Sequence, residues 1–189
     1  MKKIPGSFDE FMDLLTSRHK ILMGGWPDKN PGRIKERSNQ AGATVFVKPE
    51  LVTGTFKKGF EIYKKLTAPF SKAVFMMFLV AEVHPFDDGN GRIGRIMMNA
   101  ELASAGEQRI IIPIIYRNNY IAALKAVSHS AITNPLVRTL DFAQRYTGAV
   151  NWDNFDNTME TLTKTRAFID SNEADDAGLR LILPSKIIE

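Results

Sequence analysis

The segment from Ser71 to Val83 places the strongest limit on how this chain can fold. It is apolar on nearly every side of a helix, and its run from Ala73 to Ala81 contains no charged residue. A helix of this kind must be covered on all sides, so we expect a central buried helix with other elements packed around it. The run is far shorter than the roughly 20 apolar residues that span a bilayer, which favours a core helix over a membrane span.

The length and composition of the chain agree with a globular protein. Its 189 residues are enough for one domain with a helical appendage. The fractions of hydrophobic residues, 44%, and of charged residues, 24%, are those of an ordinary soluble protein. The charged N-terminus lacks the apolar stretch of a secretory signal, and the absence of cysteine excludes disulfides and thiolate metal sites. We therefore expect a cytoplasmic protein without a membrane partner.

Basic residues form small clusters, at Arg33, Lys35 and Arg37 and again over residues 57–65. Clusters of this size usually lie on solvated surface, and that is the expectation here. The net charge is only +4, and no nucleic-acid-binding motif accompanies the clusters. Nucleic acid is therefore not an expected partner.

Periodicity, caps and breakers predict a mainly α-helical fold with one β-hairpin. The expected helices cover residues 8–23, 49–66, 71–83, 91–105, 117–130, 134–147 and 152–171. The hairpin is expected within residues 33–47, with its turn at Asn39–Gly42 and a strand at Thr44–Val47. Pro113 favours an extended connector over residues 110–115, and the tail from Asn172 is given no element.

A polar, glycine-rich loop, His84–Arg95, follows the apolar helix. Gly89 and Gly91 allow the backbone to turn tightly and to approach a ligand closely. The helix that begins here points free N–H groups into the same space, which makes a cradle for phosphate. Arg92 and Arg95 share one face of that helix and can clamp further phosphates.

Two further residues of the loop supply chemistry. Asp88 offers carboxylate oxygens beside the phosphate cradle, which is the usual way for a protein to hold Mg²⁺. His84 has an ordinary pKa near 6.5 and suits the role of a base at neutral pH. A base, a metal ligand, an anion cradle and two arginines together indicate a phosphoryl-transfer site.

The loop resembles the defining motif of the Fic family, His-x-Phe-x-Asp/Glu-Gly-Asn-Gly-Arg-x-x-Arg, and every specified position matches. The segments 31–47, 99–102 and 117–124 are also similar to family segments. The resemblance implies a Fic domain over residues 7–147, mainly α-helical, with its hairpin flap at 33–47. Residues 148–189 are then a C-terminal helix and tail.

The resemblance implies that the chain is a protein adenylyltransferase, which moves AMP from ATP to a Ser, Thr or Tyr hydroxyl of a target protein with Mg²⁺. His84 is then the general base, Asp88 the metal ligand and Phe86 the anchor of the loop in the core. The nucleotide-binding residues it implies are Gly89, Asn90, Gly91, Arg92, Gly94, Arg95 and Tyr120. The target is implied to add a strand to the flap at Asn39, Gln40, Ala41 and Gly42.

Alternatives remain open at this point. A Fic-type enzyme can use another donor or reaction, such as UMP transfer, phosphorylation or removal of AMP. The pattern Gly89-x-Gly91-x-x-Gly94 also matches the dinucleotide fingerprint of oxidoreductases, although that fingerprint requires a strand running directly into its first glycine. Ser185–Glu189 matches the start of the inhibitory motif of the family; otherwise an antitoxin-like partner or another segment would inhibit the enzyme.

The remaining conspicuous residues are expected to have structural roles. His19 and His129 are expected at the surface or at helix ends, and Trp26 and Trp152 are expected to pack. The methionine pairs are expected to fill the core. They are Met76, Met77, Met97 and Met98.

Overall fold

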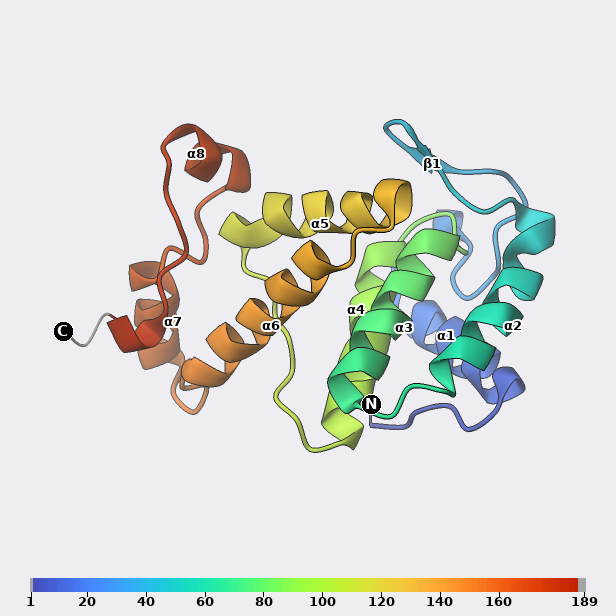
Figure 1. Ribbon diagram of the computed structural model, residues 1–189, viewed down its shortest axis with the longest axis horizontal. Helices are drawn as coiled ribbons and strands as arrows, with labels where there is room; N and C mark the ends of the chain where they lie inside the picture. The colour runs from blue at the N-terminus through green and yellow to red at the C-terminus, as the bar shows by residue number, and fades with distance from the viewer. Residues whose placement is uncertain (1, 187–189) are drawn as a thin grey trace. The chain divides into compact units, whose positions relative to one another are not determined.

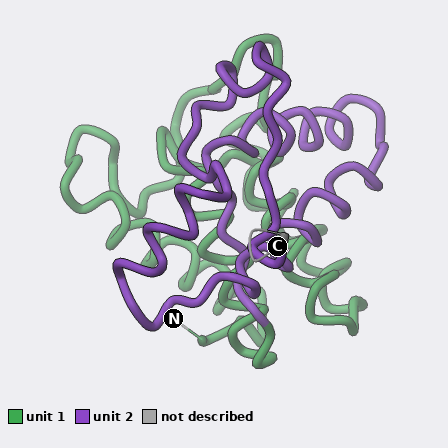
Figure 2. The backbone as a smooth tube through the Cα atoms, turned by 90° about the vertical axis from the view of Figure 1, so that its left-hand side faces the viewer, with its two compact units in different colours: residues 1–107 green, residues 108–189 purple. Residues whose placement is uncertain are grey.

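The boundary between Glu107 and Gln108 divides the chain into two compact units, coloured separately in Figure 2. The structure is a computed structural model that describes residues 2–186. It is 62% helical and contains one two-stranded antiparallel sheet, which confirms the predicted fold class. The expected domain over residues 7–147 stays a prediction.

The first unit consists of four α-helices, two 3₁₀ turns and a hairpin (Figure 1). Its elements are α1 (Phe8–Leu22), η1 (Pro27–Lys29), β1 (Gln40–Ala41), β2 (Thr44–Val45), η2 (Pro49–Leu51), α2 (Val52–Tyr63), α3 (Pro69–Val83) and α4 (Asn90–Ser104). Helix α3 begins two residues before the predicted start because Pro69 suits the first turn of a helix. The predicted helix from Pro49 is corrected to a 3₁₀ turn followed by α2.

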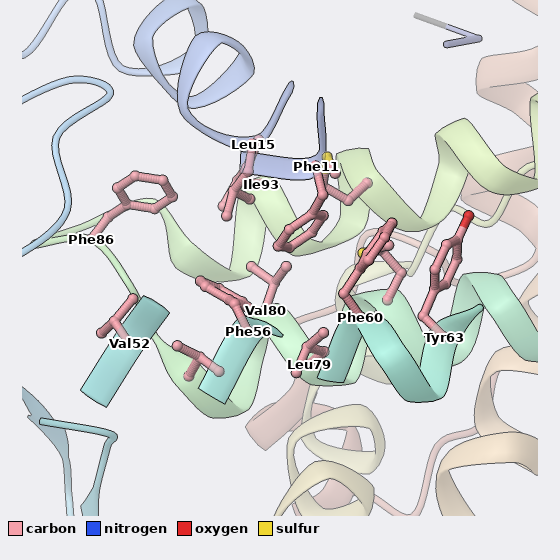
Figure 3. Close-up of a cluster of buried hydrophobic side chains, with 13 residues drawn as sticks. Phe11, Leu15, Val52, Phe56, Phe60, Tyr63, Leu79, Val80, Phe86 and Ile93 are labelled. Atoms are coloured by element: carbon pink, nitrogen blue, oxygen red, sulfur yellow. The ribbon is translucent and has the colours of Figure 1, made fainter. Parts of the chain in front are cut away.

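Helix α3 lies in the core of the first unit, as its composition predicts. Met76, Met77, Val80 and Val83 are fully buried, and α3 runs beside α4 over its length (Figure 1). The two helices approach closely at Gly94, where an added Cβ would lie 3.4 Å from the carbonyl oxygen of Met77. Aromatic side chains of α1 and α2 complete the cluster that Figure 3 shows. Met97 and Met98 are also buried, so the expectation that the methionine pairs fill the core is confirmed.

Glu101 of α4 is a buried carboxylate whose hydrogen-bond partner lies on α2. The Tyr63 hydroxyl of α2 donates to it, at 3.0 Å from each carboxylate oxygen. Burial raises the pKa of Glu101, whereas this hydrogen bond and the charges of Lys72 on α3 and Arg18 on α1 lower it. The hydrogen bond of this buried carboxylate thus links α4 to the last residue of α2.

The hairpin has a tighter turn than the sequence predicts. Gln40 pairs with Val45 and Ala41 with Thr44, so only two residues, Gly42 and Ala43, form the loop. Gly42 has φ +58°, and glycine at the first loop position is typical of such two-residue turns. The expected turn at Asn39–Gly42 is therefore wrong by about two residues, because Gln40 and Ala41 belong to the strand.

The second unit contains η3 (Ile114–Tyr116), α5 (Arg117–Ser130), α6 (Asn134–Ala149), α7 (Phe155–Lys164), α8 (Ser171–Asp176) and η4 (Pro184–Lys186). The predicted single helix 152–171 is wrong. The chain breaks at Arg166, which has φ +67°, and Asp170 caps a new helix by accepting from the backbone N–H groups of Asn172 and Glu173. The Ser185–Glu189 motif extends outside the described residues.

Among residues 2–186, no helix is both long enough and apolar enough to cross a membrane.

Candidate active site

The His84–Arg95 loop needs two unusual backbone conformations. His84 ends α3 with φ +51°, and Gly89 precedes α4 with φ +76°. Only glycine fits the second position, since an added Cβ would lie 2.9 Å from the sulfur of Met23 and 3.2 Å from Nε2 of His19. The glycine thus lets the loop turn against α1 and brings the α4 N-terminus into the site.

Asn90 closes the loop on itself. Its Oδ1 accepts from the Phe86 backbone N–H at 2.9 Å, and its Nδ2 donates to the Phe86 carbonyl at 2.8 Å. The Asn90 side chain is 2% exposed, and the Phe86 ring is fully buried in the core. Since the Asn90 amide is occupied inside the loop, the group that this residue offers to a ligand is its backbone N–H.

His19 of α1 contacts the same loop; it lies in the last turn of its helix, as one of the two predicted positions requires, but it is buried and not at the surface. Its side chain is fully buried, and its ring stacks on Phe86 at 3.6 Å between centroids with an interplanar angle of 2°. The Gly32 N–H donates to Nδ1 at 2.9 Å, so Nε2 carries the proton and donates to the Asp88 carbonyl at 3.0 Å. Burial lowers the pKa of His19, which keeps this neutral form. Spacing along the chain gave no signal of these contacts, since Asp88 is 69 residues away.

The ring of His84 is held by two neighbours. Its Nδ1 lies 3.2 Å from the Ala81 carbonyl oxygen, a contact that requires a proton on Nδ1 and leaves the lone pair on Nε2. The Phe46 ring stacks on the imidazole at 3.7 Å with an interplanar angle of 7°. Burial has the largest effect and lowers the pKa of His84; in decreasing order, the hydrogen bond with the Ala81 carbonyl raises it, the charge of Lys35 lowers it and the charge of Asp88 raises it. The lowered pKa favours the neutral form of His84 near pH 7.

Lys35 and Asn39 fasten the hairpin to the loop. The ammonium group of Lys35 donates to Asn39 Oδ1 at 2.6 Å, and Asn39 Nδ2 donates to the carbonyls of Phe86, at 3.0 Å, and His84, at 3.3 Å. Lys35 is only 3% exposed, so the expectation of a solvated cluster is wrong for this residue. Desolvation lowers its pKa, while the nearby charge of Asp87 raises it.

The N-terminus of α4 faces the loop without a side-chain cap. In an α-helix the first N–H groups have no partner inside the helix, which here are those of residues 90–92. Arg92 forms an ion pair with Asp88 at 3.3 Å, and its guanidinium lies 5.5 Å from the ring centre of Trp26, which is half exposed. Within residues 2–186, Arg95 forms no ion pair. These groups can receive an anion with several negative oxygens.

The Asp88 carboxylate fits a magnesium ion held together with phosphate oxygens. Its side chain is 51% exposed, and its oxygens accept from the Gly89 N–H and from Arg92. The described residues contain no group of three or more histidines, cysteines or carboxylates that could hold a metal alone. Mg²⁺ typically binds one or two carboxylates plus substrate phosphates and water, so a single exposed carboxylate suits it.

The other predicted site residues have different surroundings. Gln40, Ala41 and Gly42 are exposed on the hairpin and remain open to a partner. Gly94 lies against Met77 and Val80 of α3, so its role in the structure is helix packing. Tyr120 is buried on α5 of the second unit, and its place near adenine stays a prediction.

The comparisons with known proteins agree on one family. A model of the Fic/DOC family matches residues 10–102. A Fido domain-containing protein of Dictyostelium discoideum is 34% identical over 100 residues, which are 50% of this chain and 69% of that protein. The chain belongs to the Fic/DOC family. Protein adenylyltransferase fic-1 of Caenorhabditis elegans is 28% identical over 148 residues, 74% of this chain but only 29% of that Fic protein.

Solved structures show the same Fic fold. Fic-1 of Caenorhabditis elegans superimposes with a TM-score of 0.62 at 24% identity, over 76% of this chain and 41% of that one. The dinucleotide alternative is wrong, because the element before the loop is helix α3 and not a strand. In residues 2–186 the strands form only the two-stranded hairpin, which leaves no doubly wound sheet for a dinucleotide.

Proposed function

We propose that this chain transfers AMP from ATP to a hydroxyl group of a target protein. One observation carries the proposal: the complete His84–Arg95 motif is folded into a loop with a neutral histidine at one end and an uncapped helix N-terminus at the other. The adenylyltransferase name of the C. elegans relative supports AMP as the group moved. That relative is more than three times as long as the part matched here, so its activity comes to this chain as a proposal.

The triphosphate of ATP is bound by groups that converge at the start of α4. Backbone N–H groups of residues 90–92 donate to phosphate oxygens, and Arg92 and Arg95 neutralise the charge of the β- and γ-phosphates. The Asp88 carboxylate would hold Mg²⁺, which would supply neutralisation of the negative charge on the leaving pyrophosphate. Trp26 limits the directions open to Arg92 by lying against its guanidinium.

His84 acts on the acceptor. Its Nε2 takes the proton of the target hydroxyl while the hydroxyl oxygen forms a bond to the α-phosphorus. The bond from the α-phosphorus to the bridging oxygen breaks, and pyrophosphate leaves with that electron pair. The products are an AMP ester of the target, pyrophosphate and a proton on His84, so atoms and charge balance. The exposed edge of Gln40–Gly42 places the target by strand addition.

Labelled nucleotides test the proposal in a cell lysate. With ATP labelled at the α-phosphate we expect label on protein that depends on the added chain. With ATP labelled at the γ-phosphate we expect no label above that of the lysate alone, since kinases of the lysate transfer the γ-phosphate. A His84→Ala variant should lose the transfer by at least about 100-fold, because a general base contributes 10²–10⁴-fold, and it should still bind ATP. Binding is measured by isothermal titration calorimetry with a non-hydrolysable ATP analogue.

Other results would overturn the proposal in distinct ways. Label from the γ-phosphate alone would show phosphorylation, and label from α-labelled UTP in preference to ATP would show UMP transfer. Release of AMP from previously labelled protein, without transfer from ATP, would show the reverse reaction. Full activity of His84→Ala would remove the histidine from its proposed role.

A further inference from the structure

The base of the hairpin, by which we mean residues 35–39 and Phe46, is joined to the segment 83–86 by several hydrogen bonds. The Lys35 backbone N–H donates to the Pro85 carbonyl at 2.8 Å, and its ammonium group reaches the Val83 carbonyl at 3.4 Å. Asn39 adds the two hydrogen bonds to loop carbonyls described above. Every residue from 83 to 86 thus has a carbonyl bound by the hairpin base, and the two segments must move together.

Phe46 belongs to this hairpin base and touches His84 directly. Its backbone N–H donates to the Asn39 carbonyl at 3.2 Å, which extends the strand pairing by one residue pair. Its neighbour Val47 packs against the core, so the strand is fixed on both sides of Phe46. The Phe46 ring therefore lies in parallel contact with the imidazole because the hairpin holds it there.

We propose that Phe46 is a positioning residue that sets the plane of the His84 ring and links it to the hairpin edge where the target strand pairs. The Ala81 carbonyl fixes the rotation of the imidazole through Nδ1, and the Phe46 face fixes its tilt, so Nε2 keeps one direction. This inference rests on the proposed function, since the direction of Nε2 matters only if His84 takes a proton from the target. It adds that acceptor binding at β1 and base orientation by Phe46, which follows β2, depend on one hairpin.

Phe46 also changes the proton affinity of His84. Its ring excludes water from one imidazole face, and burial is the main cause of the lowered pKa of His84. The charged groups that face His84 are Lys35 from the hairpin base and Asp88 from the loop, with opposite effects. Removing the Phe46 ring should therefore raise the pKa of His84 toward the ordinary value near 6.5. The base would then be protonated over a wider range of acidic pH.

Proton NMR tests the contact without any need for activity. The chain has three histidines, so the ring protons of His84 can be assigned with a His84→Gln variant. Stacking on Phe46 should shift them to lower frequency by ring current. In Phe46→Ala we expect the shift to disappear and the titration midpoint of His84 to rise. Phe46→Tyr keeps a flat ring and should retain both properties.

Enzyme kinetics test whether the position of the His84 ring affects the rate of AMP transfer. We expect Phe46→Leu and Phe46→Ala to lower kcat by roughly 10- to 100-fold with the KM for ATP unchanged, and Phe46→Tyr to stay within about twofold. The acid limb of the kcat profile should move to higher pH in Phe46→Ala. Phe155→Leu makes the same chemical change at a ring that is 77% exposed in the second unit, and it should alter neither readout.

The outcomes separate this inference from the proposed function. If the His84 resonances and midpoint are unchanged in Phe46→Ala, the inference is overturned whether or not AMP is transferred. If Phe46→Leu is as active as Phe46→Tyr, apolar bulk is sufficient and the positioning role is likewise overturned. If the wild-type protein transfers no AMP but the NMR changes occur, the proposed function fails while the contact between Phe46 and His84 stands.

Discussion

His19 illustrates how one buried side chain can support an active-site loop without touching a substrate. Its two ring nitrogens bind backbone groups of Gly32 and Asp88, and its face covers Phe86. The backbone of Asp88 and the anchor of the loop thus depend on α1. A neutral histidine ring suits this position because it is flat and has one N–H donor and one nitrogen acceptor on different edges.

We expect His19→Ala to lower the free energy of unfolding by about 2–4 kcal/mol, because it leaves a buried N–H and a carbonyl without partners and opens a cavity under Phe86. Urea unfolding at pH 7.5 measures the change. His129→Ala makes the same substitution at an exposed position, where it opens no buried cavity, and should change stability less than His19→Ala does. Equal effects of the two substitutions would contradict the supporting role.

At the scale of elements, the close approach of α2 and α3 depends on a single glycine. Gly59 of α2 faces Leu79 of α3, and an added Cβ would lie 2.4 Å from one Leu79 methyl carbon and 3.1 Å from its Cγ. Gly54 lies on the same helix with nothing within 4 Å of its Cβ position. Alanine substitution at these two positions therefore distinguishes the effect of helix propensity on stability from the effect of packing.

We expect Gly54→Ala to stabilise the protein by about 0.5–1 kcal/mol, because alanine favours the helix. Gly59→Ala should destabilise the protein by about 1 kcal/mol. The free energy needed to displace Leu79 in a packed core exceeds the gain in helix propensity. The difference of about 2 kcal/mol can be measured by urea unfolding of both variants. Equal stabilisation by both substitutions would mean that α2 and α3 can separate without penalty.

At the scale of the whole molecule, the first unit contains its own core and the whole His84–Arg95 loop (Figures 2 and 3). Among residues 2–186, the members of the core cluster come from α1 to α4, the loop and the segments next to the hairpin. The hydrogen bonds that hold the loop likewise come from residues within the unit. This arrangement is what an independently folding unit requires.

We therefore expect a chain of residues 1–107 to fold alone. Circular dichroism should show helix, urea should unfold it in one cooperative transition, and the His84 ring protons should keep their ring-current shift. The full-length chain serves as the reference for both signals. A gradual transition, or an unshifted His84, would indicate that the second unit is needed to form the site.

Much of this molecule follows from local sequence. The apolar run around Val80 must be buried, and the glycines and arginines of the following loop must turn and bind anions, so α3, α4 and the motif were predicted. The break between α7 and α8 was also detectable, because Asp170 and Glu173 have the spacing of a capping box. These features depend on neighbours within a few residues.

The tertiary structure decided what depends on residues far apart in the chain. His19 was expected at the surface or at a helix end, and its burial depends on Asp88, 69 residues away; the carbonyl groups that Lys35 binds lie about 50 residues further on. The contact between Phe46 and His84 joins a hairpin to a helix end in the same way. Hydrogen bonding and stacking require proximity in space, and periodicity along one segment contains no information about which segments the fold brings together. The sequence by itself therefore determined the motif and its helices, and only the fold determined what holds the motif in place.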